Sequence, residues 1–151
     1  MSPTISKVLE AICLERDNER YSTSFAAAAE LIAAYGEDRL ADRLADRLFN
    51  EIPATVPFEI VAELFDIISW QTNDNGTGIA RTLESWLLAG LENRKLRIAL
   101  QVEVYPFLDA DEMVRVLSDL AQKNPKVAAR CKLLIQSRSS GANVRSLPPK
   151  P

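Results

Sequence analysis

Histidine is absent from the 151 residues, and its absence removes several kinds of chemistry at once. A Ser-His-Asp triad needs an imidazole as its base, and the common mixed zinc sites need one as a ligand. The two cysteines, Cys13 and Cys131, are too few for a metal site built from thiolates alone. No glycine-rich phosphate-binding loop follows a predicted strand. We therefore predict a protein that has no enzymatic activity and binds no metal or cofactor.

Glycine is scarce, at five residues, and long apolar runs are missing. Frequent alanine and leucine with little glycine favour helices over a turn-rich β-sandwich. No stretch approaches the run of about 18 apolar residues typical of a membrane span, and the first residues lack the features of a secretory signal. The sequence thus predicts a cytoplasmic protein with no membrane partner.

The two cysteines fall on helix faces that otherwise carry apolar residues. In a reducing compartment such residues behave as small hydrophobes rather than as disulfide partners. We therefore expect both Cys13 and Cys131 to be buried and free.

Basic residues are missing between Arg47 and Arg81, although that interval contains five carboxylates. Residues 1–75 hold 14 Asp and Glu against 6 Lys and Arg, a net charge of −8. Residues 76–151 hold 7 against 12, a net charge of +5, and the whole chain therefore carries −3. Such a charge separation steers a cationic partner toward the acidic half.

Apolar residues recur at helical spacing in eight segments. The segments are residues 4–18, 23–35 and 38–48, a helix capped at Thr55 with Pro57 in its first turn, a helix carrying Ile79 to Gly90, residues 93–105, a helix capped at Asp109, and a helix capped at Asn124 that runs to Arg138. Asp109 with Glu112 forms a capping box, and Asn124 precedes a proline suited to the first helical position. Asn75-Gly76 is typical of a turn with positive φ. Residues 100–107 fit either a strand or a helix, and we favour a helix that Pro106 ends.

Eight helices of this length predict an all-α fold, either an antiparallel bundle or a short α-solenoid of the HEAT or ARM type. Val56-Pro57-Phe58 and Tyr105-Pro106-Phe107 lie 49 residues apart, which favours the solenoid because HEAT-type repeats span roughly 40–47 residues. We expect one helical domain over residues 1–138 and a flexible tail over 139–151.

An acidic stripe is predicted on the fourth helix. Spacings of four, three and four residues place its members on one helical face. Exposed tryptophans are favoured interface anchors, and acidic rims speed the capture of basic partners. The alternatives are an ordinary solvated face and a tryptophan that packs against Trp86 or Ile79. The candidate partner-binding residues are Glu59, Glu63, Asp66, Trp70, Asn73 and Asp74.

A small, acidic, all-helical chain with HEAT-like helix pairing and no catalytic residues resembles the immunity proteins of bacterial toxin systems. The resemblance covers the general architecture of residues 22–138 and no specific motif. It implies an inhibitor that neutralises a cognate toxin, often a basic nuclease. The residues by themselves predict an acidic helical binding module.

Two other functions remain open. A homo-oligomeric scaffold could form if the acidic half of one chain met the basic half of another. A nucleic-acid-associated protein could use the basic C-terminal segment, although a pI near 5.1 and the lack of interleaved exposed aromatics disfavour it. That segment contains Lys123, Lys126, Arg130, Lys132 and Arg138.

Overall fold

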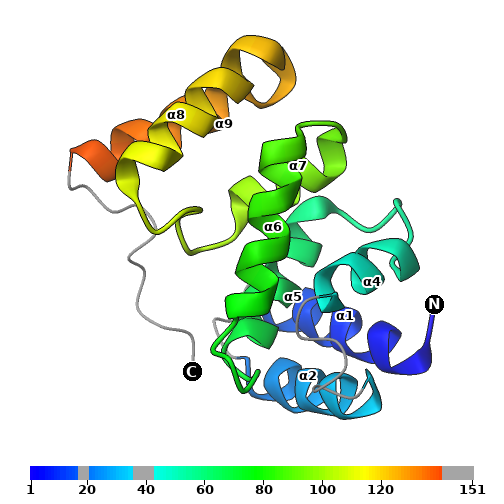
Figure 1. The fold of residues 1–151 in the computed structure, drawn as a ribbon. Helices are drawn as coiled ribbons and strands as arrows, with labels where there is room; N and C mark the ends of the chain where they lie inside the picture. Colours follow the sequence, from blue (N-terminus) through cyan, green and yellow to red (C-terminus); the bar gives the residue numbers. More distant parts are fainter. Residues whose placement is uncertain (17–20, 36–42, 141–151) are drawn as a thin grey trace. The chain divides into compact units, whose positions relative to one another are not determined.

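The structure, a computed structural model, describes residues 1–16, 21–35 and 43–140, and this part of the chain contains eight helices and no strand (Figure 1). The predicted all-α class is therefore confirmed, while the choice between a bundle and a solenoid stays a prediction. The helices are α1 (Pro3–Glu15), α2 (Ser22–Tyr35), α4 (Leu44–Glu51), α5 (Phe58–Ser69), α6 (Thr77–Ala89), α7 (Asn93–Gln101), α8 (Ala110–Lys123) and α9 (Pro125–Ser139). Residues 38–42 of the third predicted helix, and 141–151 of the predicted tail, lie outside the described residues.

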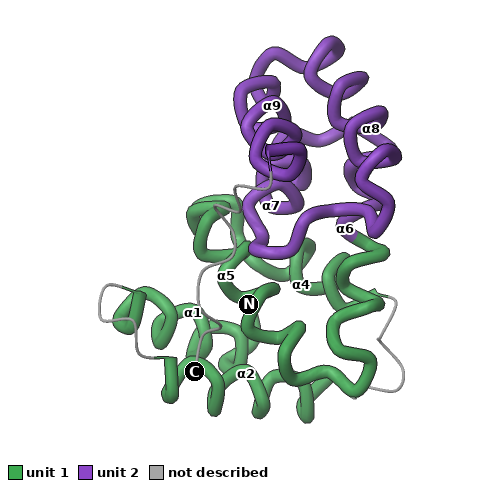
Figure 2. The backbone as a smooth tube through the Cα atoms, turned by 90° about the vertical axis from the view of Figure 1, so that its left-hand side faces the viewer, with its two compact units in different colours: residues 1–82, 149–151 green, residues 83–148 purple. Residues whose placement is uncertain are grey.

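The chain divides into two compact units (Figure 2). Unit 1 comprises residues 1–82 with 149–151, unit 2 comprises residues 83–148, and the boundary falls within α6. By sequence, unit 1 holds 14 acidic and 8 basic residues, a net charge of −6, whereas unit 2 holds 7 and 10, a net charge of +3. The predicted charge separation therefore follows the division into units.

Unit 1 is built around α5, against which both α1 and α2 pack. Five of its apolar residues recur at helical spacing and are all buried, namely Ile60, Val61, Leu64, Phe65 and Ile68. Ala62, Asp66 and Ile67 are also buried, so the buried part of α5 extends beyond that face, while Glu59 and Glu63 are half-buried. The helix begins after Pro57, and the prediction of Thr55 as its N-cap is wrong. Thus α5 is a core helix rather than the amphipathic surface helix that the sequence predicts.

The side chain of Glu15, at the end of α1, caps the start of α2. Its carboxylate accepts hydrogen bonds from the backbone N–H of Ser24 at 2.6 Å and of Thr23 at 3.1 Å, and from the Ser24 hydroxyl at 2.6 Å. Burial opposes ionisation of this carboxyl, but the hydrogen bonds from Ser24 and Thr23 outweigh it and lower the pKa of Glu15. The start of α2 is therefore tied to the end of α1 by a carboxylate at a helix N-terminus.

Cys13 is exposed, so the prediction that it is buried is wrong. The buried face of α1 consists of Ile5, Val8, Leu9, Ala11 and Ile12. Cys13 lies outside this face. The sequence pattern does not show where the buried face of a helix ends, because that depends on which other helices pack against it. Cys131 is fully buried as predicted, and both thiols are free.

In unit 2, α8 and α9 run side by side and α7 packs against α9 (Figure 1). The two predicted caps are confirmed: Asp109 accepts from the N–H of Asp111 at 3.0 Å, and Asn124 accepts from the N–H of Lys126 at 3.1 Å. Asn124 also donates through Nδ2 to Oδ1 of Asn93 at 2.7 Å. The start of α9 is thereby tied to the start of α7.

Residues 100–107 form neither the long helix nor the strand that the sequence allows. Helix α7 ends at Gln101, so its predicted extension to Tyr105 is wrong. Val102 has extended backbone angles, and its side chain and that of Phe107 are buried. The segment is therefore irregular and still contributes two side chains to the core of unit 2.

Candidate protein-binding surface

The predicted acidic stripe is not a continuous exposed face. Asp66 has only 9% of its surface exposed and is buried, which corrects the expectation that all three carboxylates are solvated. Glu59 and Glu63 are half-buried, and Asn73 is exposed. The spacing of the stripe along the helix therefore does not make all of its members accessible.

The two tryptophans differ sharply in exposure. Trp70 caps the C-terminus of α5 and is 58% exposed, whereas Trp86 is 5% exposed. The Nζ atom of Lys95 lies 5.4 Å from the centre of the Trp86 ring, a cation–π contact within unit 2. Trp86 is therefore a core residue, and the open question about Trp70 is decided in favour of exposure.

Asp74 holds together the turn that follows Trp70. One carboxylate oxygen accepts from the Thr72 hydroxyl at 2.8 Å and from the Gly76 N–H at 3.0 Å, and the other accepts from the Gly78 N–H at 2.8 Å. Burial would raise the pKa of Asp74, but the bonds from Thr72, Gly78 and Gly76 lower it. Asp74 thus has a structural role at the start of α6, in addition to its predicted role in partner binding.

The same turn packs closely against the end of α5. Asn75 and Gly76 have φ angles of 55° and 81°, which confirms the predicted positive-φ turn. A Cβ atom on Gly76 would come within 2.7 Å of the Cβ atom of Ser69. Ser69 in turn donates to the carbonyl of Phe65 at 2.7 Å. Ser69, which directly precedes the exposed Trp70, is therefore hydrogen-bonded to α5 and closely packed against the turn at Gly76.

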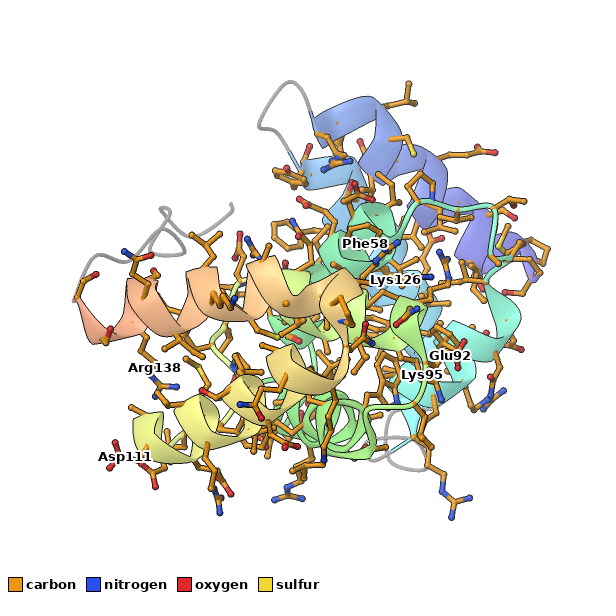
Figure 3. The ribbon with its side chains drawn as sticks, turned by 90° about the horizontal axis from the view of Figure 1, so that it is seen from above. Phe58, Glu92, Lys95, Asp111, Lys126 and Arg138 are labelled. Carbon is orange, nitrogen blue, oxygen red and sulfur yellow. The ribbon has the colours of Figure 1, made fainter. Side chains whose placement is uncertain are left out.

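A second arrangement, which the sequence analysis did not identify, lies in unit 2. Arg138 of α9 reaches toward α8 (Figure 3) and donates to the carbonyls of Pro106 at 3.3 Å, Phe107 at 2.8 Å and Leu108 at 2.8 Å. Its guanidinium carbon lies 5.3 Å from the centre of the Tyr105 ring. The only sequence signal is an arginine near a predicted helix end, where cations are common.

The backbone N–H group of Phe107 is hydrogen-bonded as well. Its N–H donates to a carboxylate oxygen of Glu84 at 3.0 Å, and its φ angle is 64°, unusual for a bulky residue. The adjacent Leu108 is 99% exposed. Two charged side chains, Glu84 and Arg138, therefore hold a strained backbone that presents an apolar residue to solvent.

Two arginines of the basic segment serve the fold of unit 2. Arg130 donates from Nε to the carbonyl of Leu100 at 3.0 Å, and burial lowers its pKa. Arg138 is engaged by the carbonyls described above. Both side chains are half-buried, which reduces the charge available for phosphate contacts. This geometry disfavours the nucleic-acid hypothesis further.

Within residues 1–16, 21–35 and 43–140, no group of three or more Cys, Asp or Glu side chains is arranged to hold a metal ion.

Among the helices that the structure describes, none is both long enough and apolar enough to cross a membrane.

Comparison of the chain with protein-family profiles, with curated protein sequences and with solved structures finds no match. Its function must therefore be inferred from the residues and geometry of this chain alone.

Proposed function

We propose that this chain is a non-catalytic binding module that inhibits a basic protein partner, in the manner of a bacterial immunity protein acting in the cytoplasm. The observation that carries the proposal is the exposure of Trp70 at the C-terminal end of α5, a helix whose apolar residues are mostly buried. A tryptophan that is 58% exposed leaves apolar surface in water unless a partner covers it. The contact region is the end of α5 and the turn that follows.

The electrostatics of unit 1 suit a basic partner. Unit 1 carries a net charge of −6, and Glu59 and Glu63 lie on α5 with partly exposed side chains. Charges at the rim of an interface mainly raise the association rate, whereas a buried aromatic anchor slows dissociation. In this proposal Glu59 and Glu63 attract the partner and Trp70 anchors it.

The rigid turn also favours a binding role. Asp74 fixes the backbone between Thr72 and Gly78, so the region after Trp70 loses little conformational freedom when a partner binds. Asn73 is exposed on this turn and supplies an amide for hydrogen bonding.

The test is affinity capture from cells of the source organism with the full chain as bait. We expect a basic protein that wild type captures and that the double variant Trp70→Ala, Glu63→Lys does not. The matched control is Leu108→Ala, Asp111→Lys, which removes one exposed apolar and one exposed acidic residue from unit 2 instead. Equal recovery of the main partner by wild type and by the Trp70 variant would show that this surface does not bind it.

A homo-oligomeric scaffold is the second candidate, favoured by the opposite net charges of the two units. Sedimentation velocity at low and high salt separates the candidates. The scaffold dissociates as salt rises, because its contacts are between charged surfaces, whereas the inhibitor is monomeric throughout.

A further inference from the structure

Unit 1 contains a groove beside α2 that the acidic stripe does not include. It has a volume of about 460 Å³ and is lined by Ala29, Ile32 and Ala33 of α2 and by Gln71, which follows Trp70. This volume falls within the range of roughly 300–1,000 Å³ that ligand-binding clefts occupy. Ala29 and Ala33 are exposed and have short side chains, so another chain can approach the helix backbone closely.

Gln71 provides the polar group of this groove. Its Nε2 donates to the carbonyl of Phe25 at 2.9 Å, which orients the amide. Its Oε1 is buried and accepts no hydrogen bond from the residues that the structure describes. A buried carbonyl oxygen without a donor is unfavourable, and rotation of the Gln71 amide toward the groove would allow a ligand N–H group to remove that cost.

The surrounding charge selects the kind of ligand. Unit 1 carries a net charge of −6, and the exposed carboxylate of Glu30 lies on α2 between Ala29 and Ala33 in sequence. Glu30 pairs with Lys7 at 2.8 Å, but both side chains are more than half exposed and can exchange partners with a cation. A segment with lysine or arginine beside an apolar residue complements this surface.

We propose that the groove formed by Ala29, Ile32, Ala33 and Gln71 binds a basic peptide segment of the partner protein. An apolar side chain of the segment enters the groove, an N–H group of the segment pairs with Gln71 Oε1 after a small shift of the amide, and flanking lysine or arginine residues face the carboxylates of unit 1. This inference rests on the proposed function, because it specifies which part of a basic partner unit 1 recognises.

The probe is a library of random linear peptides displayed on phage and selected on the full chain. We expect enriched peptides to share an apolar residue flanked by lysine or arginine, and their affinity to fall as salt rises. Synthetic peptides should bind Ala33→Leu, which fills the groove, at least about tenfold more weakly than wild type. The matched control is Ala34→Leu, the same change at an exposed neighbouring position that does not line the groove, and it should bind as wild type does.

A second variant tests the polar contact. Gln71→Met keeps an unbranched side chain but removes the acceptor, and it should also weaken peptide binding, provided that circular dichroism shows an unchanged helix content. The groove proposal is overturned if the selected peptides bind Ala33→Leu as tightly as wild type, or if they carry no basic residues. If Ala33→Leu still captures the cellular partner while the Trp70 variant does not, the proposed function stands and the groove proposal fails.

Discussion

Arg138 donates to the carbonyl of Phe107 at 2.8 Å, across 31 positions of the sequence, and Phe107 has a φ angle of 64°. Because Glu84 binds the N–H of the same residue at 3.0 Å, both polar groups of this strained backbone are satisfied by charged side chains. The strain is therefore maintained by residues on two different helices, α6 and α9.

Arg138→Ala should lower the free energy of unfolding by about 2–3 kcal/mol, because charge-assisted hydrogen bonds to three carbonyls are lost. Urea unfolding followed by circular dichroism measures the change. Arg115→Ala is the control, since Arg115 is exposed and pairs with Glu112 at 3.6 Å, and it should cost at most about 0.5 kcal/mol. A similar cost for both variants would show that the carbonyl contacts contribute little.

Gly76→Ala should destabilise the fold by about 3 kcal/mol. Alanine is strained at the φ angle of 81° that Gly76 adopts, and the added Cβ atom would lie 2.7 Å from the Cβ atom of Ser69. Gly90→Ala should cost only about 1 kcal/mol, because its φ is 64° but the nearest side-chain atom, Leu120 Cδ1, is 3.6 Å from the added Cβ. Thermal unfolding of the two variants compares them, and equal costs would contradict the close packing of the turn.

Asp74 should make stability depend on acid pH. Its folded pKa lies below its ordinary value, so its contribution is fully present above that ordinary value, about 4, and is lost as pH falls through the folded pKa. Asp74→Asn should therefore cost about 1 kcal/mol at neutral pH and less as the pH falls below about 4. Urea unfolding from neutral to acid pH measures the difference, and a difference independent of pH would contradict this role.

The two cysteines should react at very different rates. Cys13 is exposed, whereas Cys131 is fully buried, and burial raises the pKa of its thiol to about 11. Since the thiolate is the reactive form, a chromogenic disulfide reagent at mildly alkaline pH should label one thiol rapidly and the second only after denaturation. Cys13→Ser should remove the rapid phase. A rapid phase that persists in Cys13→Ser would show that Cys131 is accessible.

The two tryptophans should be distinguishable by fluorescence. Trp70→Phe leaves the buried Trp86, whose emission should be blue-shifted and poorly quenched by acrylamide. Trp86→Phe leaves the exposed Trp70, whose emission should be red-shifted and strongly quenched. Similar quenching of the two variants would contradict the exposure on which the proposed function depends.

The sequence by itself determined the features that depend on neighbouring residues. The N-caps at Asp109 and Asn124 and the positive φ angles at Asn75 and Gly76 are all where the sequence predicts them. Most caps and turns are decided within about four residues, because their hydrogen bonds connect atoms that are close along the chain, and the N-cap predicted at Thr55 is the exception. The buried apolar residues of α5 likewise recur at helical spacing, which is a local pattern.

Only the tertiary structure decided which surfaces are covered. Asp66 is buried and Cys13 is exposed, although the helical pattern predicts the reverse, because burial depends on which helix packs against each face. The early end of α7 at Gln101 and the contact of Arg138 with Phe107 likewise require residues from distant parts of the chain to meet. For the candidate site, the sequence predicted an acidic face that ends in a tryptophan. In the structure, Asp66 of that face is buried, Glu59 and Glu63 are half-buried, and Trp70 remains exposed beside a fixed turn.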